Sequence, residues 1–203
     1  MISPDTRRVL FLIIVSFLLA LPAVVANASA ETVVRISPEV SRISENGNFS
    51  LAVVIEPDVA VSGAEFLLAY DPSLVKIIRV SEGTFLKQEN EQSIFSSGST
   101  DNVNGTVSGI YGFILAEETL LDAGTFASIE FSAVGKSGIT RIELRNVTVT
   151  NSSGEKLPIV INNSRVLVGN VKDPEATQQA GHSQLAFGIF ALAGMLLVSS
   201  RKR

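Results

Sequence analysis

Several residue types that build common functional sites are missing from this chain, or nearly so. Its 203 residues include no cysteine and no tryptophan, and the single histidine is His182. Without cysteine there is no disulfide, no catalytic thiol and no cysteine-ligated zinc. A lone histidine in a polar segment is a poor basis for Ser-His-Asp chemistry. We therefore expect no metal site and no cofactor in this chain, and a fold that depends on its hydrophobic core.

Positive charge is scarce in the central part of the chain. Between Glu31 and Gln184 there are 11 lysines and arginines against 19 aspartates and glutamates, a net charge of −8. A protein that binds nucleic acid needs a basic face, so this balance argues against that class of partner. A surplus of acid is typical of a soluble, exposed domain.

The N-terminal end carries a targeting pattern. Two arginines precede an apolar run over residues 9–21, and the small residues Ala28-Ser29-Ala30 follow it. A basic start, a short apolar run and an A-x-A site predict a secretory signal peptide over residues 1–30. The alternative is an uncleaved transmembrane anchor.

The C-terminal end carries a second apolar run. Residues 185–200 consist of an apolar run, 185–198, and two serines, and three basic residues, 201–203, follow them. This pattern predicts a transmembrane helix with a basic cytoplasmic tail. A helix docked on the domain and a tail removed by processing are the alternatives. Polar residues 170–184 predict a stalk, which leaves residues 31–169 as the folded domain of an exported, single-pass cell-surface protein.

Glycosylation signals are dense in this domain. Five N-x-Ser/Thr sequons suggest a surface glycoprotein, although turns are rich in these residues in any case. The candidate asparagines are Asn48, Asn104, Asn146, Asn151 and Asn162.

The domain alternates between apolar and polar residues and shows no helical period. β-branched and aromatic residues fill short segments such as 49–55, 106–116 and 125–134, and Gly, Asn and Ser separate them. About eight to ten strands in one domain predict an all-β fold of two packed sheets.

One predicted strand, 63–70, is followed by a turn signal. Its residues Tyr70-Asp71-Pro72 predict a structural turn, because proline fixes its own φ and extends the residue before it. The Asp71 carboxylate can then accept backbone N–H groups from Ser73 or Leu74. We therefore interpret Asp71 as a cap of this turn and not as a catalytic acid.

The same strand lacks the alternation of a sheet with one wet face, because residues 66–70 are all apolar. We assign Phe66, Leu68 and Tyr70 to the core. The opposite face then carries Glu65, Leu67 and Ala69.

Unbroken alternation along 106–116 has a similar consequence. It places Val107, Tyr111, Phe113 and Leu115 in the core, and Ile110 and Ile114 on the outer face. If both strands lie in one sheet, its outer face is an apolar patch of Leu67, Ile110 and Ile114 beside Glu65 and Glu117. Such patches mark partner sites, unless a loop such as 87–99 folds over them.

Several motifs together resemble the cohesin domain. They are GAEFLLAYDPSLVKIIRVSEGTFL, GTVSGIYGFILAEE, DAGTFASIEFSAVG, GITRIELRNVTVTNSSGEKLPI and SRVLV, in family order over about 33–168. The resemblance implies a nine-stranded jelly-roll β-sandwich, related to the sandwiches of carbohydrate-binding modules. It also implies a module without enzymatic activity. Cohesins bind dockerin modules and so assemble carbohydrate-degrading enzymes on scaffolds or cell surfaces.

The resemblance also implies site residues. The dockerin contact would comprise Gly63, Glu65, Leu67, Ile114 and Glu117, to which the face assignment adds Ile110. The family commonly has Asn and Asp where this chain has Gly63 and Glu65. Calcium would sit in the loops of the dockerin partner, not in this chain. The implied protein is a cell-surface receptor for one dockerin-bearing protein, in indirect contact with polysaccharide.

Three other functions stay open from the sequence. A carbohydrate-binding module would need an aromatic platform, and Tyr70 and Tyr111 are both assigned to the core. A glycosidase would need two carboxylates, for which Glu117, Glu118 and Asp122 are the candidates in one loop. A passive adhesion module would bind no dockerin.

Overall fold

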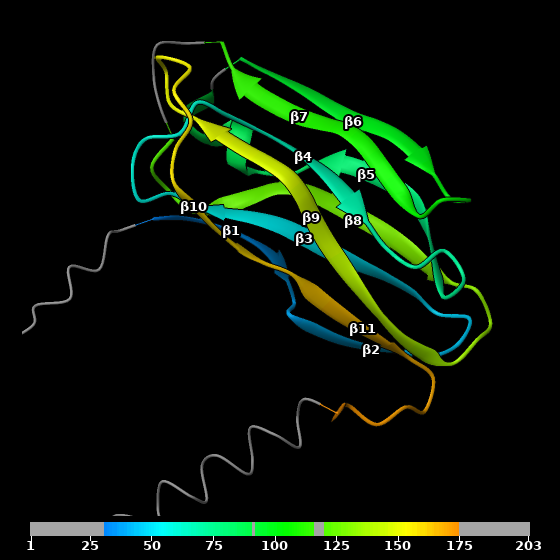
Figure 1. The fold of residues 1–203 in the computed structure, drawn as a ribbon. Coiled ribbons are helices and arrows are strands. Elements are labelled where there is room, and N and C mark those ends of the chain that lie inside the picture. Colours follow the sequence, from blue (N-terminus) through cyan, green and yellow to red (C-terminus); the bar gives the residue numbers. More distant parts are fainter. Residues whose placement is uncertain (1–30, 91, 116–119, 175–203) are drawn as a thin grey trace, which may run out of the picture. The chain divides into compact units, whose positions relative to one another are not determined.

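The structure, a computed structural model, describes residues 31–90, 92–115 and 120–174, and in them two β-sheets pack face to face (Figure 1). The first sheet has the order β10 (Ile159–Asn162), β1 (Thr32–Ser37), β3 (Asn48–Glu56), β8 (Gly124–Ala133) and β5 (Val75–Glu82). The second has the order β2 (Val40–Ile43), β11 (Ser164–Val168), β9 (Gly138–Thr150), β4 (Gly63–Ala69), β7 (Thr106–Ile114) and β6 (Ser93–Asp101). A 3-10 helix, η1 (Phe85–Asn90), links β5 to β6.

The predicted all-β sandwich is therefore confirmed. The predicted signal peptide, the transmembrane helix and most of the stalk lie outside the described residues. Within those residues, none of the helices has the length and apolar character needed to cross a membrane.

The described residues form eleven strands where nine were predicted, because two strands are broken. β1 continues as β2 after Pro38-Glu39, and β10 continues as β11 after Asn163; each continuation switches to the other sheet. The first and last strands switch together, since β1 pairs with β10 and β2 with β11, both in parallel. At the crossing point the buried Ser164 hydroxyl donates to the Pro38 carbonyl at 2.7 Å. Counting each broken strand once gives the nine of the prediction.

Aromatic side chains fill the space between the sheets at one end of the sandwich. Phe126 of β8 is fully buried and meets the rings of Phe66 and Phe95 edge-on, with ring centroids 5.8 Å apart in both cases. It also contacts Phe85 of η1 at 6.4 Å. Phe126 thus joins β8 of the first sheet to β4 and β6 of the second, so the motif GTFASIEF is a core motif.

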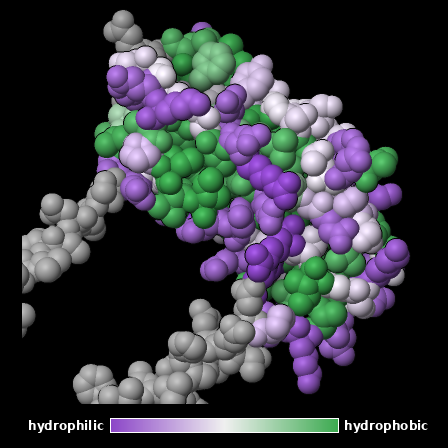
Figure 2. Space-filling view, viewed as in Figure 1, coloured by the Kyte–Doolittle hydropathy of each residue, from purple (hydrophilic) through white to green (hydrophobic). Residues whose placement is uncertain are grey.

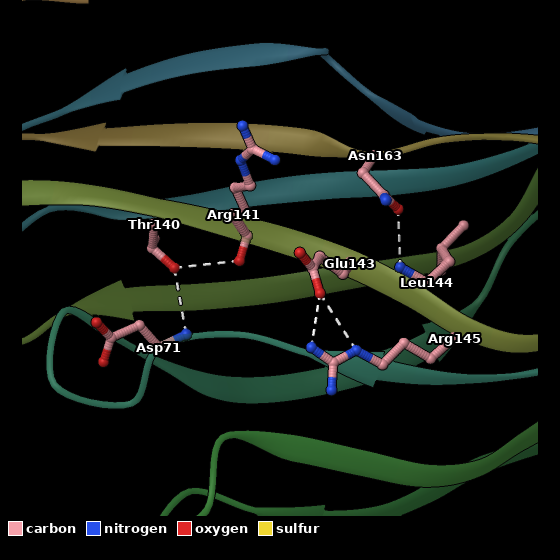
Figure 3. A network of polar contacts seen from close by, with 7 residues as sticks. All are labelled: Asp71, Thr140, Arg141, Glu143, Leu144, Arg145 and Asn163. Carbon is pink, nitrogen blue, oxygen red and sulfur yellow. Dashed lines mark hydrogen bonds and ion pairs between the residues drawn. The ribbon is translucent and has the colours of Figure 1, made fainter.

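The turn after β4 forms as its sequence predicts. The Asp71 carboxylate accepts the Ser73 N–H at 2.8 Å, and the Asp71 backbone N–H donates to the Thr140 hydroxyl at 3.2 Å (Figure 3). The Tyr70 hydroxyl donates to the Asn102 side chain at 2.7 Å. Burial raises the pKa of Tyr70, and the nearby charge of Asp101 raises it further. Asp71 is therefore a structural residue whose carboxylate is engaged by the backbone.

The second sheet contains a row of extra residues that the alternation rule did not predict. Relative to β4, β7 has one extra residue between the partners of Phe66 and Leu68, and β9 has one extra residue between the partners of Glu65 and Leu67. Residues in the left-handed backbone region mark the row: Gly98 of β6 and Gly109 of β7, each with φ of 73°, and Asn146 of β9 with φ of 52°. β-bulges of this kind reverse which residues of a strand face the core.

We expect two alanine substitutions to separate backbone strain from steric clash in this row. At Gly109 a Cβ atom would meet nothing within 4 Å, so Gly109→Ala should lower the free energy of unfolding by about 1–2 kcal/mol, through φ alone. At Gly98 a Cβ atom would lie 2.5 Å from the Ser108 carbonyl oxygen, so Gly98→Ala should cost about 3 kcal/mol or more. Urea denaturation of residues 31–174 measures both. If Gly98→Ala and Gly109→Ala lower the free energy of unfolding equally, the steric contact at Gly98 does not add to the backbone strain.

The chain turns back on the domain after β11. Gly169, with φ of 74°, makes the turn, and the Arg42 side chain then donates to the Val171 carbonyl at 3.3 Å. Arg165 and Asp173 form an ion pair of 3.0 Å whose side chains are only 18% and 7% exposed. These contacts hold the first residues of the predicted stalk against the outer face of β2 and β11. Every described strand and the core cluster lie within residues 31–174, which form one folding unit.

Candidate functional site

An apolar strip is exposed on the outer face of the second sheet. It comprises Tyr111, Phe113 and Leu115 at the end of β7 and Ile94 on the neighbouring strand β6, and we call it the β7 strip. Their exposed fractions are 40%, 38%, 55% and 42%. Figure 2 shows hydrophobic side chains gathered at the top of the view, where β7 ends in Figure 1.

The β7 strip corrects the face assignment made from alternation. Ile110 and Ile114 were predicted to form the outer patch, but they are 0% and 4% exposed and belong to the core. Tyr111, Phe113 and Leu115 were predicted to lie in the core and are at the surface. The reason is the extra residue at Ser108-Gly109: Val107 faces the core before it, and Ile110 faces the core after it. A glycine inside a predicted strand was the sequence signal that could have revealed this.

β4 follows its prediction more closely. Phe66, Leu68 and Tyr70 are buried, as assigned, while Glu65 is exposed and Leu67 is partly exposed. Ala69 differs, since it is only 7% exposed although it was assigned to the outer face. The structure thus confirms that Glu65 and Leu67 reach the outer surface.

The loop proposed as a cover does not fold over this face. Most of segment 87–99 lies in η1 and β6, and β6 pairs edge to edge with β7 over its whole length. The segment therefore extends the sheet and leaves the outer face of β7 open. Glu117 and Glu118 lie outside the described residues.

A hollow lies beside the β7 strip, over Gly63. Tyr111 and Phe113 of β7 line one side, Thr148 and Thr150 of β9 line the other, and Glu65 lies at one end. The hollow exists because residue 63 has no side chain: a Cβ atom there would lie 2.9 Å from Cβ of Phe113. We call this feature the Gly63 hollow.

The outer face changes character across β9. There the Arg145 guanidinium binds the Glu143 carboxylate at 2.7 Å, and Asn163 accepts the Leu144 N–H at 2.9 Å (Figure 3). Arg141 is exposed on the same strand. The second sheet thus presents an apolar half over β6 and β7 and a charged half over β9.

The candidate glycosylation sites lie at or near the surface. Asn48, Asn104, Asn146 and Asn162 are exposed, and Asn151 is partly exposed. The Asn104 side chain donates to the Asp101 carboxylate at 2.7 Å. Hydrogen bonds from the Asn104 backbone and side chain, and from the Val103 backbone, hold the pKa of Asp101 below its usual range. Use of any of these sites stays a prediction.

The described residues include Asp122 but not Glu117 or Glu118, the other two acids considered for a glycosidase. The described residues contain no group of three His, Cys, Asp or Glu side chains that could hold a metal ion. Asp122, one of the three acids considered for a glycosidase, is exposed, and its carbonyl oxygen accepts a hydrogen bond from the Gln88 side chain. The arrangement is suited to binding a partner surface, through the β7 strip and the Gly63 hollow.

The fold agrees with comparison to known proteins. Residues 37–168 match the family model of the cohesin domain. The chain belongs to the cohesin family. No curated protein sequence matches this cohesin.

Solved structures similar to this cohesin are cohesins as well. A non-cellulosomal cohesin from the hyperthermophilic archaeon Archaeoglobus fulgidus has 14% identity and a TM-score of 0.52, over 74% of this chain and 98% of that one. The cohesin OlpA in a type I cohesin–dockerin complex from Clostridium thermocellum has 14% identity and a TM-score of 0.56, over 68% and 99%. The third cohesin of ScaC from Acetivibrio cellulolyticus, in complex with the ScaB dockerin, has 16% identity and a TM-score of 0.54, over 68% and 99%. At these identities the likeness shows a shared fold.

Proposed function

We propose that this cohesin binds a dockerin-bearing protein through the outer face of its second sheet. The observation that carries the proposal is the β7 strip, whose two aromatic side chains are exposed side by side. Tyr111 and Phe113 have ring centroids 6.5 Å apart and an interplanar angle of 14°. Two solved relatives, OlpA and ScaC, are in complexes with dockerins, which supports the class of partner.

The β7 strip has the composition of a binding hot spot. Aromatic residues at the centre of an interface supply large rigid contact area at low entropic cost. Exposed large apolar side chains that adjoin one another on a soluble domain indicate an interaction site. The charged half of the sheet, over β9, would form the polar rim of such an interface.

The proposed setting of this interaction is the cell surface. The predicted signal peptide and C-terminal apolar run support an exported domain tethered to a membrane. Such a receptor would hold one dockerin-bearing protein, and its contact with polysaccharide would be indirect. We expect no reaction to be catalysed by the chain.

Calorimetry tests the proposal directly. Residues 31–174 are titrated with dockerin modules encoded in the same genome, in calcium and again with a chelator. At least one should bind in a calcium-dependent manner. Phe113→Asp should weaken that binding by at least about 100-fold, because it places an unpaired charge at the centre of the contact.

Ile78→Asp is the matched control. Ile78 is 53% exposed on β5 of the first sheet, so the same change there should leave binding unaltered. The proposal fails if none of these dockerins binds. It also fails if Phe113→Asp binds as tightly as the native domain.

Direct binding of carbohydrate is a second candidate, because the structure removes part of the argument against it. Tyr111 is exposed, and its ring and that of Phe113 are nearly parallel, as in a platform for a sugar ring. This function predicts retention of residues 31–174 on cellulose or chitin without any protein partner. Tyr111→Ala should then abolish retention of the domain on the polysaccharide. If the domain binds only dockerins, neither the native domain nor the Tyr111→Ala variant should be retained.

A further inference from the structure

We propose that the Gly63 hollow receives a lysine or arginine side chain of the bound partner, with the cationic group at Glu65. The inference rests on the proposed function for the identity of the partner. It concerns the chemistry of one contact, which can be measured separately.

The shape of the hollow fits a long side chain. Residue pairing places Phe113 and Thr150 on either side of Gly63, and Tyr111 and Thr148 on either side of Glu65. The floor is glycine backbone, one wall is aromatic, and the other consists of Thr148 and Thr150, of which the Thr150 hydroxyl donates to the Gly63 carbonyl at 3.5 Å. A lysine or arginine packs its methylene stem on such surfaces while its charged end reaches a polar group.

The charge of Glu65 selects the end group. No described residue forms an ion pair or a side-chain hydrogen bond with its carboxylate, in contrast to Glu143, which binds Arg145. A partner seated on the β7 strip would remove water from Glu65. Glu65 is exposed in the free domain, and an ionised carboxylate that is desolvated without a partner is strongly unfavourable, so a surface that covers it binds better when it supplies a cation there.

The aromatic wall adds to this preference. Tyr111 is the cross-strand neighbour of Glu65, so a cation at the carboxylate lies beside the edge or face of an aromatic ring. A hydroxyl group would supply one hydrogen-bond donor and leave the negative charge uncompensated. Phosphate or carboxylate groups would be repelled.

NMR titration of residues 31–174 tests the contact without any dockerin. The probes are acetyl-lysine-N-methylamide and its uncharged counterpart acetyl-norleucine-N-methylamide. The lysine probe should shift the amide signals of Gly63, Glu65 and Gly112 at least about threefold more than the neutral probe. In Glu65→Gln the two probes should give equal shifts. In Glu130→Gln, a carboxylate of the first sheet, the native difference should persist.

Equal shifts by both probes in the native domain, or a lysine response unchanged in Glu65→Gln, would overturn the inference. If a dockerin binds in calorimetry, Glu65→Lys should weaken it at least about 30-fold, and exchange of the contacting dockerin lysine or arginine for glutamate should restore part of that loss. Dockerin binding that is indifferent to Glu65→Lys contradicts the inference and leaves the proposed function intact. If the lysine probe shifts the amide signals selectively but no dockerin binds, the proposed function is wrong. The inference that the Gly63 hollow binds a cationic side chain then still holds.

Discussion

Ile110→Asp is expected to unfold this domain, whereas Tyr111→Asp, one residue further along β7, is expected to leave it folded. Ile110 is fully buried in the core, while Tyr111 is 40% exposed. The first change removes a buried side chain, at a cost of about 2–5 kcal/mol, and adds a carboxylate that has no partner in the core. Since a domain is stable by about 5–15 kcal/mol in total, the sum of these terms is comparable with the whole stability.

Far-UV and near-UV circular dichroism, together with urea denaturation of residues 31–174, measure this contrast. Tyr111→Asp should change the free energy of unfolding by less than about 1 kcal/mol, as for other surface positions. Ile110→Val is the matched conservative change and should cost about 1 kcal/mol. If Ile110→Asp is folded and Tyr111→Asp is unfolded, Tyr111 faces the core and Ile110 faces outward, as simple alternation predicts. That result would contradict the burial described for β7.

Phe126→Ala is expected to lower the free energy of unfolding by about 3–5 kcal/mol. The ring is fully buried and contacts three other aromatic rings, so its removal leaves a cavity that the rigid strands cannot fill. It also lies under the candidate site: a Cβ atom on Gly112 would be 3.2 Å from the Phe126 ring. The loss of stability should therefore be accompanied by shifted NMR signals along β7.

Phe113→Ala provides the matched control, since it removes the same ring from the same neighbourhood. Phe113 is 38% exposed, and the change should cost about 1 kcal/mol or less. Thermal and urea denaturation of both variants measure the difference. Similar losses for the two would show that Phe126 does not hold the sheets together.

Much of the fold could be predicted from local sequence. The core face of β4 follows from the alternation of its large side chains Phe66, Leu68 and Tyr70. In β8 the alternation holds from Ala127 to Ala133, but Phe126 is an extra residue relative to β3 and is buried out of phase with it. The Tyr70-Asp71-Pro72 turn was also predictable, since proline and an aspartate cap act within a few residues. The same holds for the resemblance to cohesins, whose motifs coincide with buried positions such as Phe126.

The candidate site was predictable only in part. Glu65 and Leu67 were placed correctly on the outer face, because β4 keeps its alternation. Ile110 and Ile114 were placed wrongly, because the extra residue of β7 exchanges the two faces after Gly109. A bulge is defined by pairing with a neighbouring strand, and that pairing is not contained in the sequence of one strand.

By itself, the sequence determined the fold class, the cohesin family and the absence of cysteine chemistry. These properties depend on composition and on the order of short motifs. Only the tertiary structure decided which side chains of β7 are exposed on the outer face and that Gly63 opens a hollow between Phe113 and Thr150. It also fastened residues 170–173 to the outer face of β11. Each of these features arises where separate strands or segments meet, and their register and spacing are set by packing of the whole domain.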